Sequence, residues 1–438
     1  MSAVPSRLPR LRAVTREIPA GSGLDADADL LEYADPRSPL VWSRRGDVLI
    51  GVGSAFVYVG SPGVQPRHVA RAWSDVASRA EIDDPLSLPG TGLVAFATLP
   101  FDAESSRGAL LVVPETIIGR RAGRTWLTRV SSADDADPEP AADAGATDLP
   151  ARTGYGPHWS ARVGPGTLTP EDYQSIVAAG LEEIAAGTVS KVVLARDLAG
   201  TVPPGSDLRR LVRALASSYP DTWTFAVDGL IGASPETLLT VSGGDVTARV
   251  LAGTAARGAD PDADTLAAVA LSTSTKDLDE HHYAVQSVLS ALRPHTTALV
   301  AQEQPFMLKL PNVWHLATDV EGRLSAGASA LDLIDAVHPT AAVAGTPTAR
   351  ALEVIRGLEP FDRGRYAGPV GWTDANGNGE WAIALRCAQF ERETATVDAA
   401  GGIPFTAHAG AGIVAGSDPE SEMLETRVKF RPIVDALA

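Results

Sequence analysis

The stretch TWTFAVDGLIGASPETLLTVSGGDVTARVL, residues 222–251, carries the clearest fold signal in this sequence. Asp228-Gly229 and Gly243-Gly244 each separate two apolar runs, and such dipeptides are typical of tight β-hairpins. The pattern predicts strands over residues 222–227, 230–241 and 245–251, joined as an antiparallel meander. The sheet that contains them is therefore at least partly antiparallel.

The rest of the chain mixes strand-like and helix-like patterns, without a solenoid repeat and without strict βαβ alternation. We therefore predict an α+β fold with large, mostly antiparallel β-sheets. Further strands are expected at residues 48–53, 92–99, 108–114, 190–196, 312–320, 368–372, 381–389 and 404–409. Helices are expected from residue 169, over residues 208–215 and over residues 277–292.

Composition narrows the class of protein. The 438 residues are 45% hydrophobic and 21% charged, as in a globular protein with an ample core. The net charge of −17 argues against nucleic acid or an anionic membrane as the main partner. The single cysteine, Cys387, excludes an intrachain disulfide and a cysteine-rich zinc site. No apolar run suggests a signal peptide or a membrane span, so we expect a cytoplasmic protein.

An acidic segment divides the chain. Residues 131–153 are rich in Ala, Asp, Pro and Gly and predict an exposed, flexible loop. We place a boundary there, with residues 1–150 as an N-terminal region that acts as scaffold. Residues 151–438 carry the residues with chemical potential and form the expected catalytic region.

Two acid pairs share one spacing. Glu422 and Glu425 lie three residues apart, as do Asp277 and Glu280, so each pair projects from one helical face. Each alone is compatible with a solvated acidic helix start that the helix dipole favours. Two helices carrying such pairs could also meet around a divalent cation, and carboxylate oxygens favour Mg²⁺.

The segment AGAGIVAGSDPESEMLETRVK, residues 409–429, predicts a small-residue turn followed by a helix. Ser417 or Asp418 is the expected N-cap. Gly410 and Gly412 in the turn would let the backbone approach a ligand and present N–H groups to an anion.

An isolated lysine and an isolated glutamate have two interpretations each. Lys191 begins the apolar strand SKVVLAR, where it either reaches the surface or faces a cavity as a desolvated base. Glu236 follows Pro235, which places the backbone at an edge or bulge. It is either an edge-strand residue in water or a proton donor whose pKa is raised by an apolar site.

Three further residues suit an anionic ligand. Arg386 lies in an apolar strand, where its planar guanidinium could bind a carboxylate, and Tyr366 could add a hydroxyl donor. Lys429 is placed to pair with Glu425 or to reach the same ligand. Together with the acid pairs, these residues suggest a negatively charged ligand held through Mg²⁺.

Seven motifs, in order, carry a resemblance to a known family. They are SKVVLAR, GASPETLL, LAGTAARG, KDLDEH, HPTAAVAGTP, RGRYAGPVGW and the segment at residues 409–429. From about Leu168 to the C-terminus the chain resembles the chorismate-utilising enzymes, and most closely the isochorismate synthases. The resemblance implies large antiparallel sheets packed together and flanked by helices, with the N-terminal region completing the fold in a monomer.

The resemblance also implies a reaction in which water adds at C2 of chorismate while the C4 hydroxyl leaves, giving isochorismate. Lys191 would be the general base and Glu236 the general acid. Glu280 and Glu425 would bind Mg²⁺ directly, and Asp277 and Glu422 largely through water. Substrate contacts would come from Gly253, Thr254, His315, Tyr366, Arg386, Gly410, Gly412 and Lys429.

Two residues separate the subfamilies that the resemblance covers. Anthranilate synthases lack the lysine found here at position 191, and aminodeoxychorismate synthases have a lysine where this chain has Ala252. The resemblance therefore implies no glutaminase subunit. Salicylate synthase remains the alternative, a non-catalytic chorismate-binding protein is a further one, and the product could feed menaquinone or siderophore biosynthesis.

Overall fold

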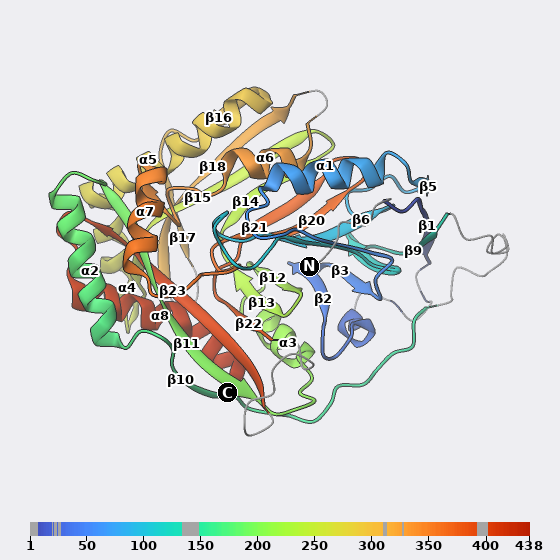
Figure 1. The fold of residues 1–438 in the computed structure, drawn as a ribbon, viewed down its shortest axis with the longest axis horizontal. Coiled ribbons are helices and arrows are strands. Elements are labelled where there is room, and N and C mark those ends of the chain that lie inside the picture. The colour runs from blue at the N-terminus through green and yellow to red at the C-terminus, as the bar shows by residue number, and fades with distance from the viewer. Residues whose placement is uncertain are drawn as a thin grey trace.

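Two large β-sheets packed face to face form the body of the protein (Figure 1). The computed structural model describes residues 8–19, 21, 24, 28–133, 149–309, 313–325, 328–391 and 402–438. Every strand pairing recorded there is antiparallel except that of β1 with β5. The predicted α+β class with large, mostly antiparallel sheets is confirmed.

Within the described ranges, one sheet has thirteen strands. In spatial order they are β10 (Arg162–Pro165), β11 (Lys191–Val202), β23 (Ile403–Val414), β22 (Cys387–Phe390), β13 (Leu230–Ser234), β12 (Trp223–Val227), β2 (Leu40–Arg44), β3 (Asp47–Val52), β8 (Thr116–Arg121), β9 (Arg124–Ser132), β1 (Leu11–Ile18) and β5 (Glu81–Asp83), with β19 (Gly345–Thr346) beside β11.

The other sheet has ten strands in the same described part of the chain. Their order is β16 (Thr296–Ala301), β18 (Val313–Leu324), β15 (Asp245–Ala256), β14 (Thr237–Ser242), β21 (Gly379–Ile383), β20 (Pro369–Asp374), β6 (Val94–Thr98), β7 (Leu110–Val113) and β4 (Phe56–Val59), with β17 (Phe306–Lys309) beside β18.

Helices flank the sheets (Figure 1). They are α1 (Pro66–Ala77), α2 (Pro170–Ala185), α3 (Arg209–Ser218), α4 (Pro261–Thr273), α5 (Thr275–Leu292), α6 (Ala330–Val337), α7 (Thr348–Leu358) and α8 (Pro419–Leu437), with short 3-10 turns at Leu30–Tyr33 and Arg293–His295. Helix α5 packs on β15 and β18, α8 packs on β23, and α2 and α7 pack on β11. The two helices that carry the acid pairs thus belong to different sheets.

The meander predicted over residues 222–251 changes sheet in its middle. Its first hairpin joins β12 to β13 in the thirteen-stranded sheet, and its second joins β14 to β15 in the ten-stranded sheet. Both predicted hairpin turns are confirmed, but the single strand expected over residues 230–241 is wrong. Pro235 and Glu236 form the crossing, because proline has no N–H to donate to a strand ladder.

A second crossing lies beside the first. The single strand predicted over residues 381–389 splits into β21 in one sheet and β22 in the other. Arg386 lies in this crossing with a φ of 50°, a left-handed conformation that is uncommon outside glycine. The Ser234 hydroxyl donates a 2.6 Å hydrogen bond to the carbonyl of Ile383, which ties the two crossings together.

The predicted small-residue turn over residues 409–416 is also wrong in its position. Gly410 and Gly412 lie inside β23, which pairs with β11 along its whole length. The small residues adopt an extended strand conformation because they pair with the distant strand β11, and the local sequence does not indicate this pairing. Helix α8 then begins with Asp418 as N-cap, whose carboxylate accepts the N–H of Ser421, as predicted.

The core occupies both faces of the thirteen-stranded sheet. Between the sheets, large side chains such as Trp42, Phe225, Leu239, Trp372 and Trp381 are buried in one cluster. A second cluster fills the other face of the sheet under α3 and α8. This burial stabilises the arrangement of the strands, because removing apolar surface from water drives folding.

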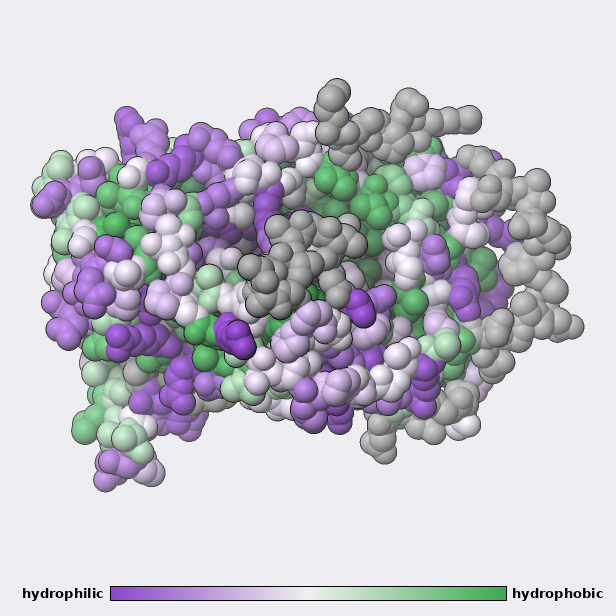
Figure 2. All heavy atoms as spheres, turned by 60° about the horizontal axis from the view of Figure 1, so that its bottom comes forward, coloured by the Kyte–Doolittle hydropathy of each residue, from purple (hydrophilic) through white to green (hydrophobic). Residues whose placement is uncertain are grey.

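The N-terminal region contributes β1 to β9 to both sheets. The boundary near residue 150 stays a prediction, and residues 134–148 of the expected acidic loop lie outside the described residues. None of the described helices has the length and apolar character needed to cross a membrane. Figure 2 shows hydrophilic and hydrophobic side chains intermingled over one face of the molecule, an ordinary pattern for a protein surface.

Candidate active site

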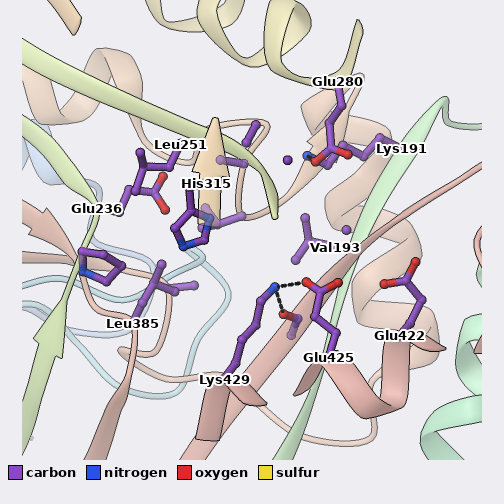
Figure 3. Close-up of a pocket in the computed structure, with 18 of the residues that line it drawn as sticks. Lys191, Val193, Glu236, Leu251, Glu280, His315, Leu385, Glu422, Glu425 and Lys429 are labelled. Carbon is purple, nitrogen blue, oxygen red and sulfur yellow. Dashed lines mark hydrogen bonds and ion pairs between the residues drawn. The ribbon is translucent and has the colours of Figure 1, made fainter. Parts of the chain in front are cut away.

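One cavity of about 310 Å³ collects the residues singled out by the sequence (Figure 3). Among the predicted site residues, Thr254 is the exception, because its side chain lies outside the described part of the chain. The predicted residues that line the cavity are Lys191, Glu236, Gly253, Asp277, Glu280, His315, Tyr366, Arg386, Gly410, Gly412, Glu422, Glu425 and Lys429. Their roles stay predictions, but their assembly in one place is a structural fact.

Glu236 is placed by the first sheet crossing. Its side chain is 7% exposed, and within the described residues no hydrogen bond to its carboxyl group is found. Burial raises the pKa of Glu236 to about 7, although the charges of Lys191, Arg386 and Lys429 act against the shift. A carboxyl group of this kind keeps its proton near neutral pH and can donate it.

Lys191 is the first residue of β11 and is 6% exposed. It faces the cavity rather than the surface, and its role as a base stays a prediction. Its ammonium donates to Glu280 Oε1 at 2.6 Å. Gly412 makes room for this pair, because a Cβ there would lie 3.0 Å from Lys191 Cε and 3.4 Å from Glu280 Oε1.

The acid pairs face the cavity from two helices. Asp277 and Glu280 come from α5, and Glu422 and Glu425 come from α8. Burial and the negative charge of Glu425 raise the pKa of Glu422, so a cation beside these two groups would relieve an unfavourable arrangement. Four carboxylates and no thiolate are donors that fit Mg²⁺ chemically.

Two of the four carboxylates, Glu280 and Glu425, are paired with lysines. Besides the Lys191–Glu280 pair, Lys429 Nζ lies 2.5 Å from Glu425 Oε1 and 2.9 Å from the carbonyl oxygen of Gly410 (Figure 3). Within the described ranges, no three Asp, Glu, His or Cys side chains are arranged to hold a metal ion directly. Cation binding would therefore require these lysine contacts to be exchanged.

The remaining wall of the cavity is polar and mostly buried. Arg386 and Tyr366 are 8% and 6% exposed, and burial lowers the pKa of Arg386 and raises that of Tyr366. Burial also lowers the pKa of His315 to about 3, so this imidazole is neutral. Gly253 has a φ of 81° where the β15–β18 register shifts, and a side chain there would crowd Asp277 Cβ.

Sequence reasoning missed two cations at this cavity. Lys276 lies at its exposed rim, directly before Asp277, and nothing local distinguished it from a solvated lysine. Arg363 is buried with Glu359, and its guanidinium also donates to the carbonyl oxygens of Val343 and Val193. The apolar residues around RGRYAGP were the available signal for a buried arginine.

Comparison with known proteins supports the motif resemblance. A family model described as chorismate binding enzyme matches residues 13–438. Isochorismate synthase DhbC of Bacillus subtilis (strain 168) is 42% identical over 280 residues, which are 61% of this chain and 68% of that protein. The MenF protein of Mycobacterium tuberculosis (strain ATCC 25618 / H37Rv) is 37% identical over 362 residues, 80% of this chain and 87% of that protein.

Solved structures agree on the fold. The menaquinone-specific isochorismate synthase MenF of Escherichia coli superposes with a TM-score of 0.76 over 97% of this chain and 95% of that chain. At 23% identity this likeness concerns the fold alone. The family model, however, spans nearly the whole sequence. The chain therefore belongs to the chorismate binding enzyme family.

Proposed function

We propose that this chain is an isochorismate synthase, an isomerase that converts chorismate to isochorismate. The observation that carries the proposal is a buried lysine, Lys191, in the same cavity as a carboxylic acid, Glu236, whose pKa is raised to about 7. Figure 3 places the two side chains on different sides of the cavity, as a base and an acid acting at different ring carbons require. The names of relatives such as DhbC support the same activity.

In the proposed reaction, the amine of Lys191 accepts a proton from a water molecule as that water adds at C2. The ring double bonds shift, and the C4 hydroxyl leaves as water after taking the proton of Glu236. One proton is gained by the base and one is lost by the acid, so the protein keeps its net charge. General acid and base groups of this kind contribute about 10²- to 10⁴-fold each to a rate.

Substrate recognition rests on the cations of the cavity. Arg386 and Tyr366 are the proposed contacts of the enolpyruvyl carboxylate, because a buried guanidinium and hydroxyl suit a planar anion. Lys429, Gly253, Gly410 and Gly412 would line the ring. The neutral His315 can donate or accept a hydrogen bond without adding charge.

We further propose Mg²⁺ as the cofactor. Glu280 and Glu425 would be its direct ligands, and Asp277 and Glu422 would act largely through water. Bound there, the ion would supply positive charge for the ring carboxylate of chorismate. The proposal is supported by the oxygen donors that line the cavity and by the raised pKa of Glu422.

Product analysis tests this function. Purified protein with chorismate and Mg²⁺ should form isochorismate, EDTA should stop the reaction, and added Mg²⁺ should restore it. Salicylate with pyruvate as products would favour the alternative, a salicylate synthase. Binding of chorismate in a calorimeter without turnover would instead identify a non-catalytic chorismate-binding protein.

The proposal also covers the localisation, oligomeric state and pathway of the enzyme. We expect a cytoplasmic monomer without a glutaminase subunit, because water rather than ammonia is the proposed nucleophile. Isochorismate would enter menaquinone or siderophore biosynthesis. Deleting the gene and restoring growth with a menaquinone or with a siderophore precursor would separate the two pathways.

A further inference from the structure

A second, much smaller cavity lies behind Glu236. Its volume is about 10 Å³, close to the space that one buried water molecule needs. Glu236 and Ala342 line both this cavity and the large one, so they form the wall between the two. The small cavity is completed by Thr237, Leu238, Arg249, Val250, Ala284, Val288 and Thr340.

Thr340 is the unusual member of this lining. It is 5% exposed, and its hydroxyl oxygen has no hydrogen-bond partner within the described part of the chain. Its backbone carbonyl accepts the N–H groups of Val343 and Ala344, so its position is fixed. A buried hydroxyl is normally satisfied by protein or by ordered water.

Glu236 also lacks a hydrogen bond at its carboxyl group within the described residues, but this group borders the large cavity as well as the small one. The carboxyl group is buried, whereas the backbone N–H of Glu236 donates to Ser234 and its carbonyl oxygen accepts from Ile383. A buried hydroxyl without a partner and a carboxyl group without a hydrogen bond thus adjoin a space that fits one water molecule. A single bridging water would satisfy both groups.

We propose that one ordered water molecule in this cavity bridges the Thr340 hydroxyl and the Glu236 carboxyl group, which makes Thr340 a positioning residue for the acid. The Thr340 O–H donates to the water, and the water donates to the carboxyl oxygen that does not carry the proton. The other oxygen is then free to present its proton to the large cavity. The role of Thr340 and the water in turnover rests on the proposed function, in which Glu236 is the general acid.

The bridge also stabilises the carboxylate that remains after proton transfer. Other groups that face Glu236 are Lys191 on β11, Arg386 at the second crossing and Lys429 on α8. Arg249 on β15 lines the small cavity but is held by both carboxylate oxygens of Asp319. None of these is changed by removing the Thr340 hydroxyl, so its loss should weaken the acid specifically.

Replacing the hydroxyl by a methyl group tests the bridge. In Thr340→Val we expect kcat to fall about tenfold with KM unchanged, since one hydrogen bond to a charged group corresponds to about one pKa unit. The alkaline limb of the kcat–pH profile should move upward by about one pH unit. Thr340→Ser keeps the hydroxyl and should restore both kcat and the position of the limb.

Thr98→Val is the matched control. Thr98, the last residue of β6, is a fully buried threonine whose hydroxyl likewise has no partner among the described residues, but it lines neither cavity. This variant should keep the wild-type kcat and pH profile. Circular dichroism and urea unfolding confirm that each variant is folded.

A wild-type kcat and pH profile in Thr340→Val would overturn the proposal. A lower kcat without a shift of the limb, or without rescue by serine, would show a structural role alone and would overturn it as well. A high-resolution crystal structure of the wild type gives an answer independent of activity and of variant folding: a water between Thr340 and Glu236 supports the bridge, and a dry cavity refutes it. Failure of the wild type to form isochorismate would count against the proposed function and not against the water site.

Discussion

The Lys191 ammonium lies 2.6 Å from Glu280 Oε1, so the proposed base is bound to a proposed metal ligand. Both side chains are largely shielded from solvent, with exposed fractions of 7% and 13%. An ammonium held in this way has no free lone pair. Lys191 can therefore act as a base only after it releases a proton, and a cation bound to Glu280 would displace the ammonium from this contact.

Lys191→Ala should reduce turnover by about 10²- to 10⁴-fold, the range expected for loss of a general base. The secondary structure should be unchanged, because the side chain ends in a cavity. Steady-state assays of isochorismate formation measure the effect. Lys309→Ala, which removes an exposed lysine outside this cavity, is the control and should leave turnover unchanged. Wild-type turnover in Lys191→Ala would exclude this lysine as the base.

Glu422→Gln should raise the Mg²⁺ concentration needed for half-maximal activity by roughly 10- to 100-fold, as for other residues that act on a metal through water. The exposed Glu420, two residues earlier on the same helix, offers a control, and Glu420→Gln should leave the Mg²⁺ requirement unchanged. Activity is measured against Mg²⁺ concentration for both. Equal Mg²⁺ curves for the wild type and Glu422→Gln would remove Glu422 from the metal site.

Glu236 should make stability depend on pH. Its pKa is about 7 in the folded protein against 4.5 as the ordinary value, so the folded state binds more protons between these values. The free energy of unfolding therefore decreases as pH rises through this window, by up to about 3 kcal/mol from this group. Glu236→Gln should be more stable than the wild type at pH 8 and nearly equal to it at pH 4.

Urea unfolding of both proteins at the two pH values measures this difference. The comparison cancels the titration of every other group that the substitution leaves unchanged. A stability difference that is the same at pH 4 and pH 8 would show that the carboxyl group of Glu236 titrates normally.

Breaking the buried Arg363–Glu359 pair should cost stability. Glu359 accepts two hydrogen bonds from the Arg363 guanidinium and one from the N–H of Ala195, all in the interior. Glu359→Gln would leave an uncompensated buried charge, which costs about 3–5 kcal/mol. Glu353→Gln breaks an exposed pair with Arg350 and should cost under about 1 kcal/mol. Equal losses in urea unfolding would contradict this reading of the buried pair.

Local turn chemistry made the hairpins of residues 222–251 predictable. The sequence did not show that the chain changes sheet at Pro235 and again near Arg386, because an apolar run predicts a strand but not its partner. Gly410 and Gly412 were expected in a turn, but they lie in β23. Their strand conformation depends on pairing with the distant strand β11, which the local sequence does not reveal.

The site was partly predictable. The acid pairs depend on helical spacing alone, and the structure places them at the cavity as expected. The contact between Lys191 and Glu280 joins residues 89 positions apart, and the unpartnered hydroxyl of Thr340 is a property of packing. Neither has a signal in the local sequence.

The addition of solvent water at C2 is the central claim, and an isotope label tests it most directly. The reaction would be run in H₂¹⁸O with Mg²⁺, and the isochorismate formed would be analysed by mass spectrometry and NMR. We expect one ¹⁸O atom in the C2 hydroxyl of the product. Unlabelled isochorismate would mean that the hydroxyl moves within the substrate, and this would contradict the roles assigned to Lys191 and Glu236.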